Sequence, residues 1–85
     1  MATVKLFGAF GDMAGWSVRE IDASTLGEVK AAIVAGSDGR LAERLEHPGT
    51  LVIVNAAVIP FSLRTDGSPV AASDELAFGP PVSGG

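Results

Sequence analysis

The sequence predicts an α+β domain: a single mixed β-sheet that carries one main helix, and a short second helix, on one face. Two segments near the N-terminus alternate apolar and polar residues, as strands with one buried face do. The period then becomes helical, and an apolar run rich in β-branched residues and a last strand-like segment follow. A helix that lies between strand pairs in this order crosses over one face of the sheet.

The N-terminal segment predicts two strands joined by a turn. Residues 3–10 alternate so that Phe7 falls on the opposite side from the other apolar residues, which include Phe10. Glycines interrupt the pattern over residues 8–15, and alternation returns over residues 16–21. Two strands connected by a short loop that contains glycine form a hairpin.

Two helices are expected next. Thr25 and Glu28 match a capping box, in which two side chains satisfy backbone N–H groups at the start of a helix. Apolar residues then recur at helical spacing for about three turns, until Gly36 supplies a common type of helix end. Residues 40–46 predict a shorter helix whose apolar residues, Ala42 among them, face the core, before a Pro-Gly pair ends it.

The remaining strands lie in the second half of the chain. Residues 51–54 form a continuous apolar run, which is typical of a strand covered on both faces, so we expect this strand at the centre of the sheet. Asn55 tolerates a positive φ, so we expect a turn there. Residues 58–59 predict a short returning strand, and residues 74–78 predict a last strand. This order suits the ubiquitin-like β-grasp arrangement for residues 1–78.

Composition and charge argue against several classes of protein. A chain of 85 residues supports one domain, and a deep active site would remove core that it needs, so we expect no enzyme acting alone. The net charge of −4 argues against nucleic acid and anionic membranes as partners. No apolar run approaches the roughly 18 residues of a membrane span, and no signal peptide is recognisable, so we expect a cytoplasmic protein. The chain has no cysteine and one histidine, His47, and predicts no metal site.

The C-terminal segment, residues 79–85, is expected to be an extended and flexible tail. Pro80 and Pro81 stiffen its start, and the segment can project roughly 20 Å from the domain. Gly84 and Gly85 have no side chains, so a free carboxylate there can pass through a narrow tunnel into another protein's active site. A frayed terminus is the alternative, but it does not require the paired prolines.

The end of the chain resembles that of a known family. The last residues are Asp74-Glu75-Leu76-Ala77-Phe78-Gly79-Pro80-Pro81-Val82-Ser83-Gly84-Gly85. They consist of an acidic pair, an apolar strand, two prolines, a valine, a small residue and two glycines. This ending resembles the MoaD family, the small subunits of molybdopterin synthase, which are ThiS/MoaD-like sulfur carriers with a ubiquitin fold. The opening strand, the helix start at residues 25–28 and the apolar strand that ends in Asn55 are similar to the family as well.

The resemblance implies that Gly85 is the reacting residue. An E1-like adenylyltransferase similar to MoeB would use ATP to form an acyl-adenylate there, which becomes a thiocarboxylate. A large subunit similar to MoaE would take the sulfur for the molybdopterin dithiolene, while this chain is non-catalytic and binds no cofactor. The residues expected to thread the partner's active site are Pro80, Pro81, Val82, Ser83 and Gly84.

The surface expected to dock the partner includes Phe7, Val58 and Phe78, because a large exposed apolar group on a small acidic domain commonly marks an interface. Two departures from the family pattern bear on this surface. Gly79 stands where many family members carry a bulky apolar residue that contacts the partner, so part of that contact is expected to be missing or shifted. The turn at residues 55–57 is also more apolar than is common in the family.

Three other functions remain open. The chain could carry sulfur for thiamine, cysteine or tRNA thiolation, since related carriers share the Gly-Gly ending, and only Pro80-Pro81-Val82 and the chain length favour the molybdopterin branch. It could instead be a ubiquitin-like modifier joined through Gly85 to lysines of target proteins. The third alternative is a passive binding module with an inert tail.

Overall fold

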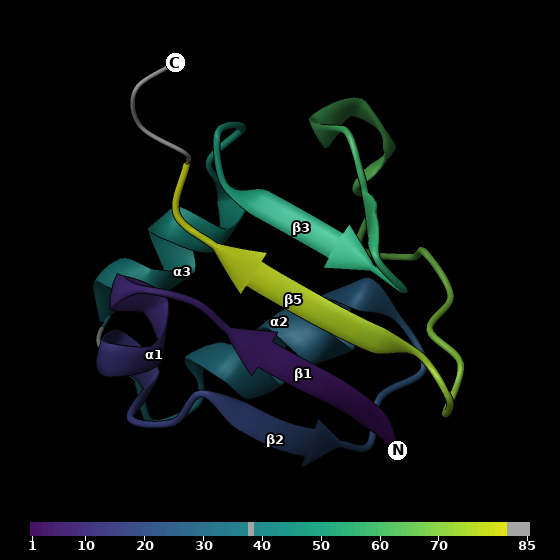
Figure 1. Cartoon of the computed structure of the whole chain (residues 1–85), viewed down its shortest axis with the longest axis horizontal. Coiled ribbons are helices and arrows are strands. Elements are labelled where there is room, and N and C mark those ends of the chain that lie inside the picture. Colours follow the sequence, from purple (N-terminus) through teal and green to yellow (C-terminus); the bar gives the residue numbers. More distant parts are fainter. Residues whose placement is uncertain (38, 82–85) are drawn as a thin grey trace.

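The computed structural model describes residues 1–37 and 39–81, which form a five-stranded mixed sheet in the order β2-β1-β5-β3-β4 (Figure 1). The strands are β1 (Ala2–Leu6), β2 (Val18–Ile21), β3 (Leu51–Val54), β4 (Ala57–Val58) and β5 (Glu75–Gly79). Strand β5 runs parallel to β1 and antiparallel to β3, and the two outer pairs are antiparallel. The predicted α+β class with a mixed sheet is confirmed.

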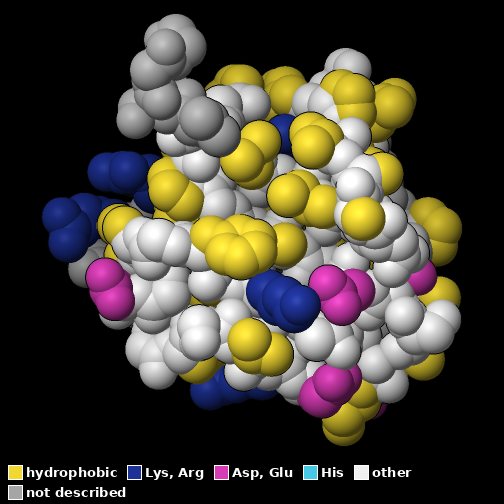
Figure 2. Space-filling model, viewed as in Figure 1, with side chains coloured by type: hydrophobic (Ala, Val, Ile, Leu, Met, Phe, Trp, Pro, Cys, Tyr) yellow, Lys and Arg dark blue, Asp and Glu magenta, His cyan; other side chains and the backbone are white. Residues whose placement is uncertain are grey.

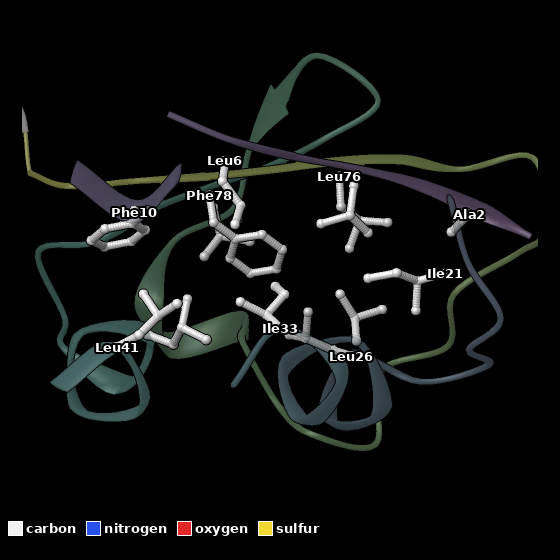
Figure 3. Packing of buried hydrophobic residues seen from close by; sticks show 13 residues of the cluster. Ala2, Leu6, Phe10, Ile21, Leu26, Ile33, Leu41, Leu76 and Phe78 are labelled. Carbon is white, nitrogen blue, oxygen red and sulfur yellow. The ribbon is translucent and has the colours of Figure 1, made fainter. Parts of the chain in front are cut away.

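Helices cover one face of this sheet. They are α1 (Ala9–Ala14), α2 (Leu26–Val34) and α3 (Gly39–Glu46), and a short 3₁₀ helix, η1 (Phe61–Leu63), follows β4. The core lies between the sheet and α2 and α3, and Figure 3 shows Phe78 and Leu76 of the sheet facing the helical residues Ile33 and Leu26. None of the helices in the described part of the chain is long and apolar enough to cross a bilayer.

The connection between the first two strands differs from the predicted turn. Gly8 adopts φ 55° and ψ −136°, which ends the strand direction, and the next residues form α1 instead of extending β1 to Phe10. Phe10 still reaches the core, fully buried, but from the helix. Gly15, at φ 86°, ends α1 and donates its N–H to the carbonyl of Gly11 at 2.8 Å. The alternation therefore located the buried side chain but not the local structure that carries it.

The main helix begins and ends where the sequence predicted. The Glu28 N–H donates to Thr25 Oγ1 at 3.2 Å, as a capping box requires. The Glu28 carboxylate, however, accepts from the N–H of Ser24 at 2.7 Å, one residue before the expected donor. This backbone bond is the main reason why the pKa of Glu28 lies below 4.5. The second helix is also confirmed, although its Ala42 is exposed and does not face the core.

The central strand is β5, so the prediction that residues 51–54 would be central is wrong. Only the two-residue β4 lies outside β3, and of the β3 side chains Val52 alone is fully buried. In β5, by contrast, the four residues after Glu75 are buried on both faces. Leu51 and Ile53 of β3 are only partly buried, and they lie on the face of the sheet turned away from the helices.

The turn between β3 and β4 is a two-residue loop. Asn55 and Ala56 adopt φ values of 50° and 69°, which is the geometry of the primed hairpin turns. The Asn55 side chain ties this loop to the start of β5, because Nδ2 donates to Asp74 Oδ1 at 3.0 Å and Oδ1 accepts from the Glu75 N–H at 2.9 Å. The turn predicted at Asn55 is confirmed, with Ala57 already in β4.

Candidate functional site

The tail leaves the domain from the end of the central strand. Gly79 is buried and pairs with Leu51, so β5 extends one residue beyond its expected end and the segment outside the sheet begins at Pro80. In Figure 1 this exit lies beside α3 and the beginning of β3. The expected sulfur-bearing residue Gly85 and the threading residues 82–84 lie outside the described residues, so their roles remain predictions.

The two prolines at the base of the tail lie against two loops. A Cβ placed on Gly8 would lie 3.4 Å from Pro80 Cγ, and a Cβ placed on Gly49 would lie 3.2 Å from Pro81 Cγ. Pro81 also lines a hollow of about 150 Å³ with Arg44, His47 and Thr50. The base of the tail is therefore in contact with the body of the domain.

His47 stabilises the loop between α3 and β3, which contacts Pro81. Its Nδ1 accepts a hydrogen bond from the Gly49 N–H at 2.9 Å, and its carbonyl accepts from the Thr50 N–H at 3.0 Å. Thr50 is almost fully buried, and its hydroxyl donates to the carbonyl of Arg44. These bonds brace the connection from α3 to β3. In the part of the chain that the structure describes, no three His, Cys, Asp or Glu side chains gather where a metal ion could bind.

The face of the sheet turned away from the helices carries apolar side chains. Register places Ala77, Ile53 and Val58 in one row across β5, β3 and β4, and Phe7 and Leu51 lie in the next row beside Gly79. These residues (Phe7, Leu51, Ile53, Val58 and Ala77) are called the open face below. Figure 2 shows apolar side chains spread over this side of the molecule, next to basic and acidic ones. Lys5 and Glu75 form an ion pair of 3.2 Å within the same face.

The predicted docking residues divide between the two faces of the sheet. Phe7 and Val58 are 50% and 59% exposed and lie on the open face, as a docking surface requires. Phe78 is 0% exposed and points into the core, so its assignment to the docking surface is wrong. Neighbouring residues of a strand point to opposite faces, and Ala77 and Gly79 occupy the open one. Ile53 was missed because its apolar run was interpreted as a strand covered on both sides.

Phe7 covers the glycine that distinguishes this chain from the family pattern. A Cβ on Gly79 would lie 3.3 Å from Phe7 Cβ and 3.7 Å from its ring carbon Cδ2. The side chain of Phe7, the residue that follows β1, thus occupies space above Gly79 that a side chain at that position would need. An apolar group consequently remains at the end of the open face that adjoins the tail.

A second hollow, lined mainly by apolar residues, lies next to η1. It measures about 260 Å³ and is lined by Leu26, Val52, Val54, Ile59, Leu63, Ser68, Pro69, Val70 and Leu76. Beside it, Arg64 Nε donates to the carbonyl of Ile59 at 2.9 Å, and burial lowers the pKa of this guanidinium. The lining contains no titratable side chain, so the hollow offers volume but no group for acid–base chemistry and no base beside the Ser68 hydroxyl.

Comparison with known proteins agrees with this geometry. The ThiS family model matches residues 4–85. Among solved structures, SAMP1 from Haloferax volcanii is 28% identical, with a TM-score of 0.72 over 99% of this chain and 98% of that one. A chain of the BexX/CysO complex of Amycolatopsis orientalis is 23% identical, with a TM-score of 0.79 and full coverage of both chains.

A Pyrococcus furiosus protein assigned as molybdopterin converting factor subunit 1 is 17% identical, with a TM-score of 0.64 over 95% of this chain and 97% of that one. The comparison with curated proteins found no match. Together, the family match over nearly the whole chain, the mixed sheet and these structural neighbours identify the fold as the ubiquitin-like β-grasp. The chain belongs to the ThiS family, as its resemblance to ThiS/MoaD-like proteins predicted.

Proposed function

We propose that this chain is a sulfur carrier whose terminal Gly85 is converted to a thiocarboxylate. The observation that carries the proposal is the position of the tail base: Pro80 follows the central strand directly, and the last residue of that strand lies beside the exposed Phe7. A partner that binds the open face would therefore receive the tail at the edge of the same contact. Membership of the ThiS family supports this use of the Gly-Gly ending.

The proposed chemistry begins on an activating enzyme. A carboxylate oxygen of Gly85 attacks the α-phosphorus of ATP and displaces pyrophosphate, which gives an acyl-adenylate. A persulfide sulfur then attacks the carbonyl carbon and displaces AMP, which forms an acyl disulfide. A second thiol cleaves that disulfide, leaving the thiocarboxylate on Gly85 and a disulfide on the sulfur donor. Glycine at both final positions leaves the carbonyl open to each attack.

The proposed partners follow from this chemistry. An E1-like adenylyltransferase similar to MoeB would activate the chain, and a large subunit similar to MoaE would accept the sulfur for the molybdopterin dithiolene, both in the cytoplasm. The ending Pro80-Pro81-Val82 favours this branch over carriers for thiamine, cysteine or tRNA thiolation. The chain would supply sulfur, and the large subunit would supply the catalytic groups and the pterin pocket.

A second candidate function is protein modification. SAMP1 from H. volcanii, which is described as a small archaeal modifier protein, is 28% identical over 99% of this chain. An acyl-adenylate at Gly85 can react with a lysine amine as well as with a persulfide, and the product would be an isopeptide bond. The two functions thus share the activation step and differ in the nucleophile that follows.

Intact-mass measurement tests the proposal. The protein is incubated with the E1-like enzyme of the same genome, ATP and a persulfide donor, and we expect the mass gain that replaces one oxygen by one sulfur. Deletion of Gly85 should abolish the gain while circular dichroism and melting stay unchanged, because the core strand ends at Gly79. No gain in the full chain would refute the sulfur carrier, and isopeptide conjugates on added proteins would favour the modifier. Dithiolene formation with a MoaE-like subunit would establish the molybdopterin branch.

A further inference from the structure

The first two residues beyond β5, Pro80 and Pro81, lie next to glycines of two separate loops. Strand β5 lies between β1, which is parallel to it, and β3, which is antiparallel. The loop that follows β1 and the loop that precedes β3 therefore meet the chain where it leaves β5. Gly8 of the first loop faces Pro80, and Gly49 of the second faces Pro81.

The two contacts differ in how much space they leave for a side chain. A Cβ on Gly8 would be 3.4 Å from Pro80 Cγ and 3.6 Å from Cδ, which is ordinary van der Waals contact. A Cβ on Gly49 would be only 3.2 Å from Pro81 Cγ, so the proline ring or the loop would have to move. Because proline fixes its own φ, the position of each ring also constrains the direction of the backbone that follows it.

The loop that carries Gly49 is braced from α3. The same Cβ on Gly49 would lie 3.2 Å from Cε1 and Nδ1 of His47, whose ring accepts the Gly49 N–H. Buried Thr50 secures the loop through its bonds to His47 and Arg44. A side chain at Gly49 is therefore confined on one side by a hydrogen-bonded ring and on the other by Pro81.

We infer that Gly8 and Gly49 are positioning residues that set the direction in which the tail leaves the domain. The inference rests on the proposed function and adds that the carrier itself, and not only its partner, directs the Gly85 carbonyl. The four residues beyond Pro81 can span at most about 13 Å. A change of direction at Pro81 shifts the region that Gly85 can reach within that length, and a misplacement of about 1 Å at a reacting atom can cost on the order of 100-fold in rate.

Gly49→Ala is the most direct perturbation. Gly49 does not belong to the glycines with positive φ, so alanine fits its backbone, whereas Gly8, at φ 55°, would be strained by any side chain. Gly67→Ala is the matched control, because a Cβ there meets nothing within 4 Å. Pro81→Ala is a second perturbation that removes the ring from the tail side and leaves the folded body intact.

The first measurement reports the tail direction without reference to function. The chain has no cysteine, so spin labels on Ala31→Cys, exposed on α2, and on Ser83→Cys give a single distance distribution by pulsed electron paramagnetic resonance. We expect Gly49→Ala to shift this distribution and Pro81→Ala to broaden it, while Gly67→Ala leaves it unchanged. Identical distributions in all four backgrounds would overturn the inference.

The second measurement reports the reaction in unlabelled protein. We expect Gly49→Ala to lower the adenylation rate about tenfold while the dissociation constant for the activating enzyme changes less than twofold and the melting temperature falls only slightly. A purely structural role would lower the melting temperature and leave the rate of the bound complex unchanged, which would overturn the positioning role. If the wild-type chain is not adenylated at all, the proposed function fails, and the spin-label distances still decide whether the glycines direct the tail.

Discussion

Replacement of Phe7 by alanine should reduce both the stability of the domain and its affinity for a partner, because the ring has two roles. One half of the side chain lies against the sheet, where it covers Gly79, and the other half is exposed on the open face. If the ring were only a docking group, its removal would leave the stability of the domain unchanged. The contact with Gly79 predicts a measurable loss instead.

The magnitudes follow from the exposed fraction. A buried aromatic side chain removes about 150–250 Å² from water, and Phe7 is 50% exposed, so roughly 100 Å² of it is buried against the domain. At about 25 cal/mol per Å² this contact contributes at most about 2.5 kcal/mol, of which alanine retains part. We therefore expect Phe7→Ala to lower the free energy of unfolding by about 1–2 kcal/mol. The exposed half should contribute about 1–3 kcal/mol to binding, or roughly 5- to 150-fold in affinity.

Urea unfolding and calorimetric titration with the activating enzyme measure the two effects separately. Each kcal/mol should lower the melting temperature of a domain of this size by about 4–8 °C. Phe61→Ala is a suitable control, because Phe61 is also 50% exposed but lies in η1, outside the sheet, and should change affinity less than twofold. An unchanged stability would refute the packing of Phe7 on Gly79. An unchanged affinity of the folded variant would place the docking surface elsewhere.

Three further changes test the hairpin turn, an acidic hydrogen bond and the end of the tail. Ala56→Gly should raise the melting temperature, because relief of a left-handed alanine, about 1–2 kcal/mol, exceeds the entropy that glycine adds to the unfolded chain, about 0.4–1 kcal/mol. A hydrogen bond from Asn55, and then one from the Ala71 N–H, hold the pKa of Asp74 below 3.8. Its stabilisation is thus present above the ordinary value and lost as the pH falls through the lowered pKa of the folded state, so Asp74→Asn should flatten the fall of the urea midpoint below about pH 5; a parallel profile would contradict this. Gly84→Ala should slow single-turnover sulfur transfer strongly while partner affinity is nearly retained, and equal modest losses would argue against a narrow tunnel.

Elements governed by local chemistry could be predicted from the sequence. The start of α2 depends on Thr25 and Glu28, and the hairpin turn depends on the tolerance of Asn55 for a positive φ. Helix α1 could not be predicted, because glycines usually indicate a turn and the burial of Phe10 requires contacts with distant parts of the chain. The centre of the sheet also depends on pairing between strands far apart in sequence, which the composition of a single strand does not reveal.

In the candidate site, too, some features could be predicted from local sequence and others depend on contacts between distant segments. Phe7 could be identified because it alternates with buried neighbours in β1. Phe78 was assigned wrongly because β5 is apolar on both faces, so no alternation distinguishes its two sides. The contacts of Gly8 and Gly49 with the prolines carry no sequence signal, since they arise only when β5 inserts between two strands from the earlier part of the chain.

The position of β5 between two strands from earlier in the chain also affects how the sheet forms during synthesis. Synthesis proceeds at roughly 5–20 residues per second, so the segment of β1 is made about 4–15 s, and that of β3 about 1–5 s, before the strand that joins them is complete. During this interval both present unpaired edges, which are prone to pair with other chains. A nascent or cleaved chain that lacks residues 75–79 cannot close its sheet. Such a chain would be handled by chaperones and proteases, and it would not persist as a folded competitor that occupies the activating enzyme without a reactive end.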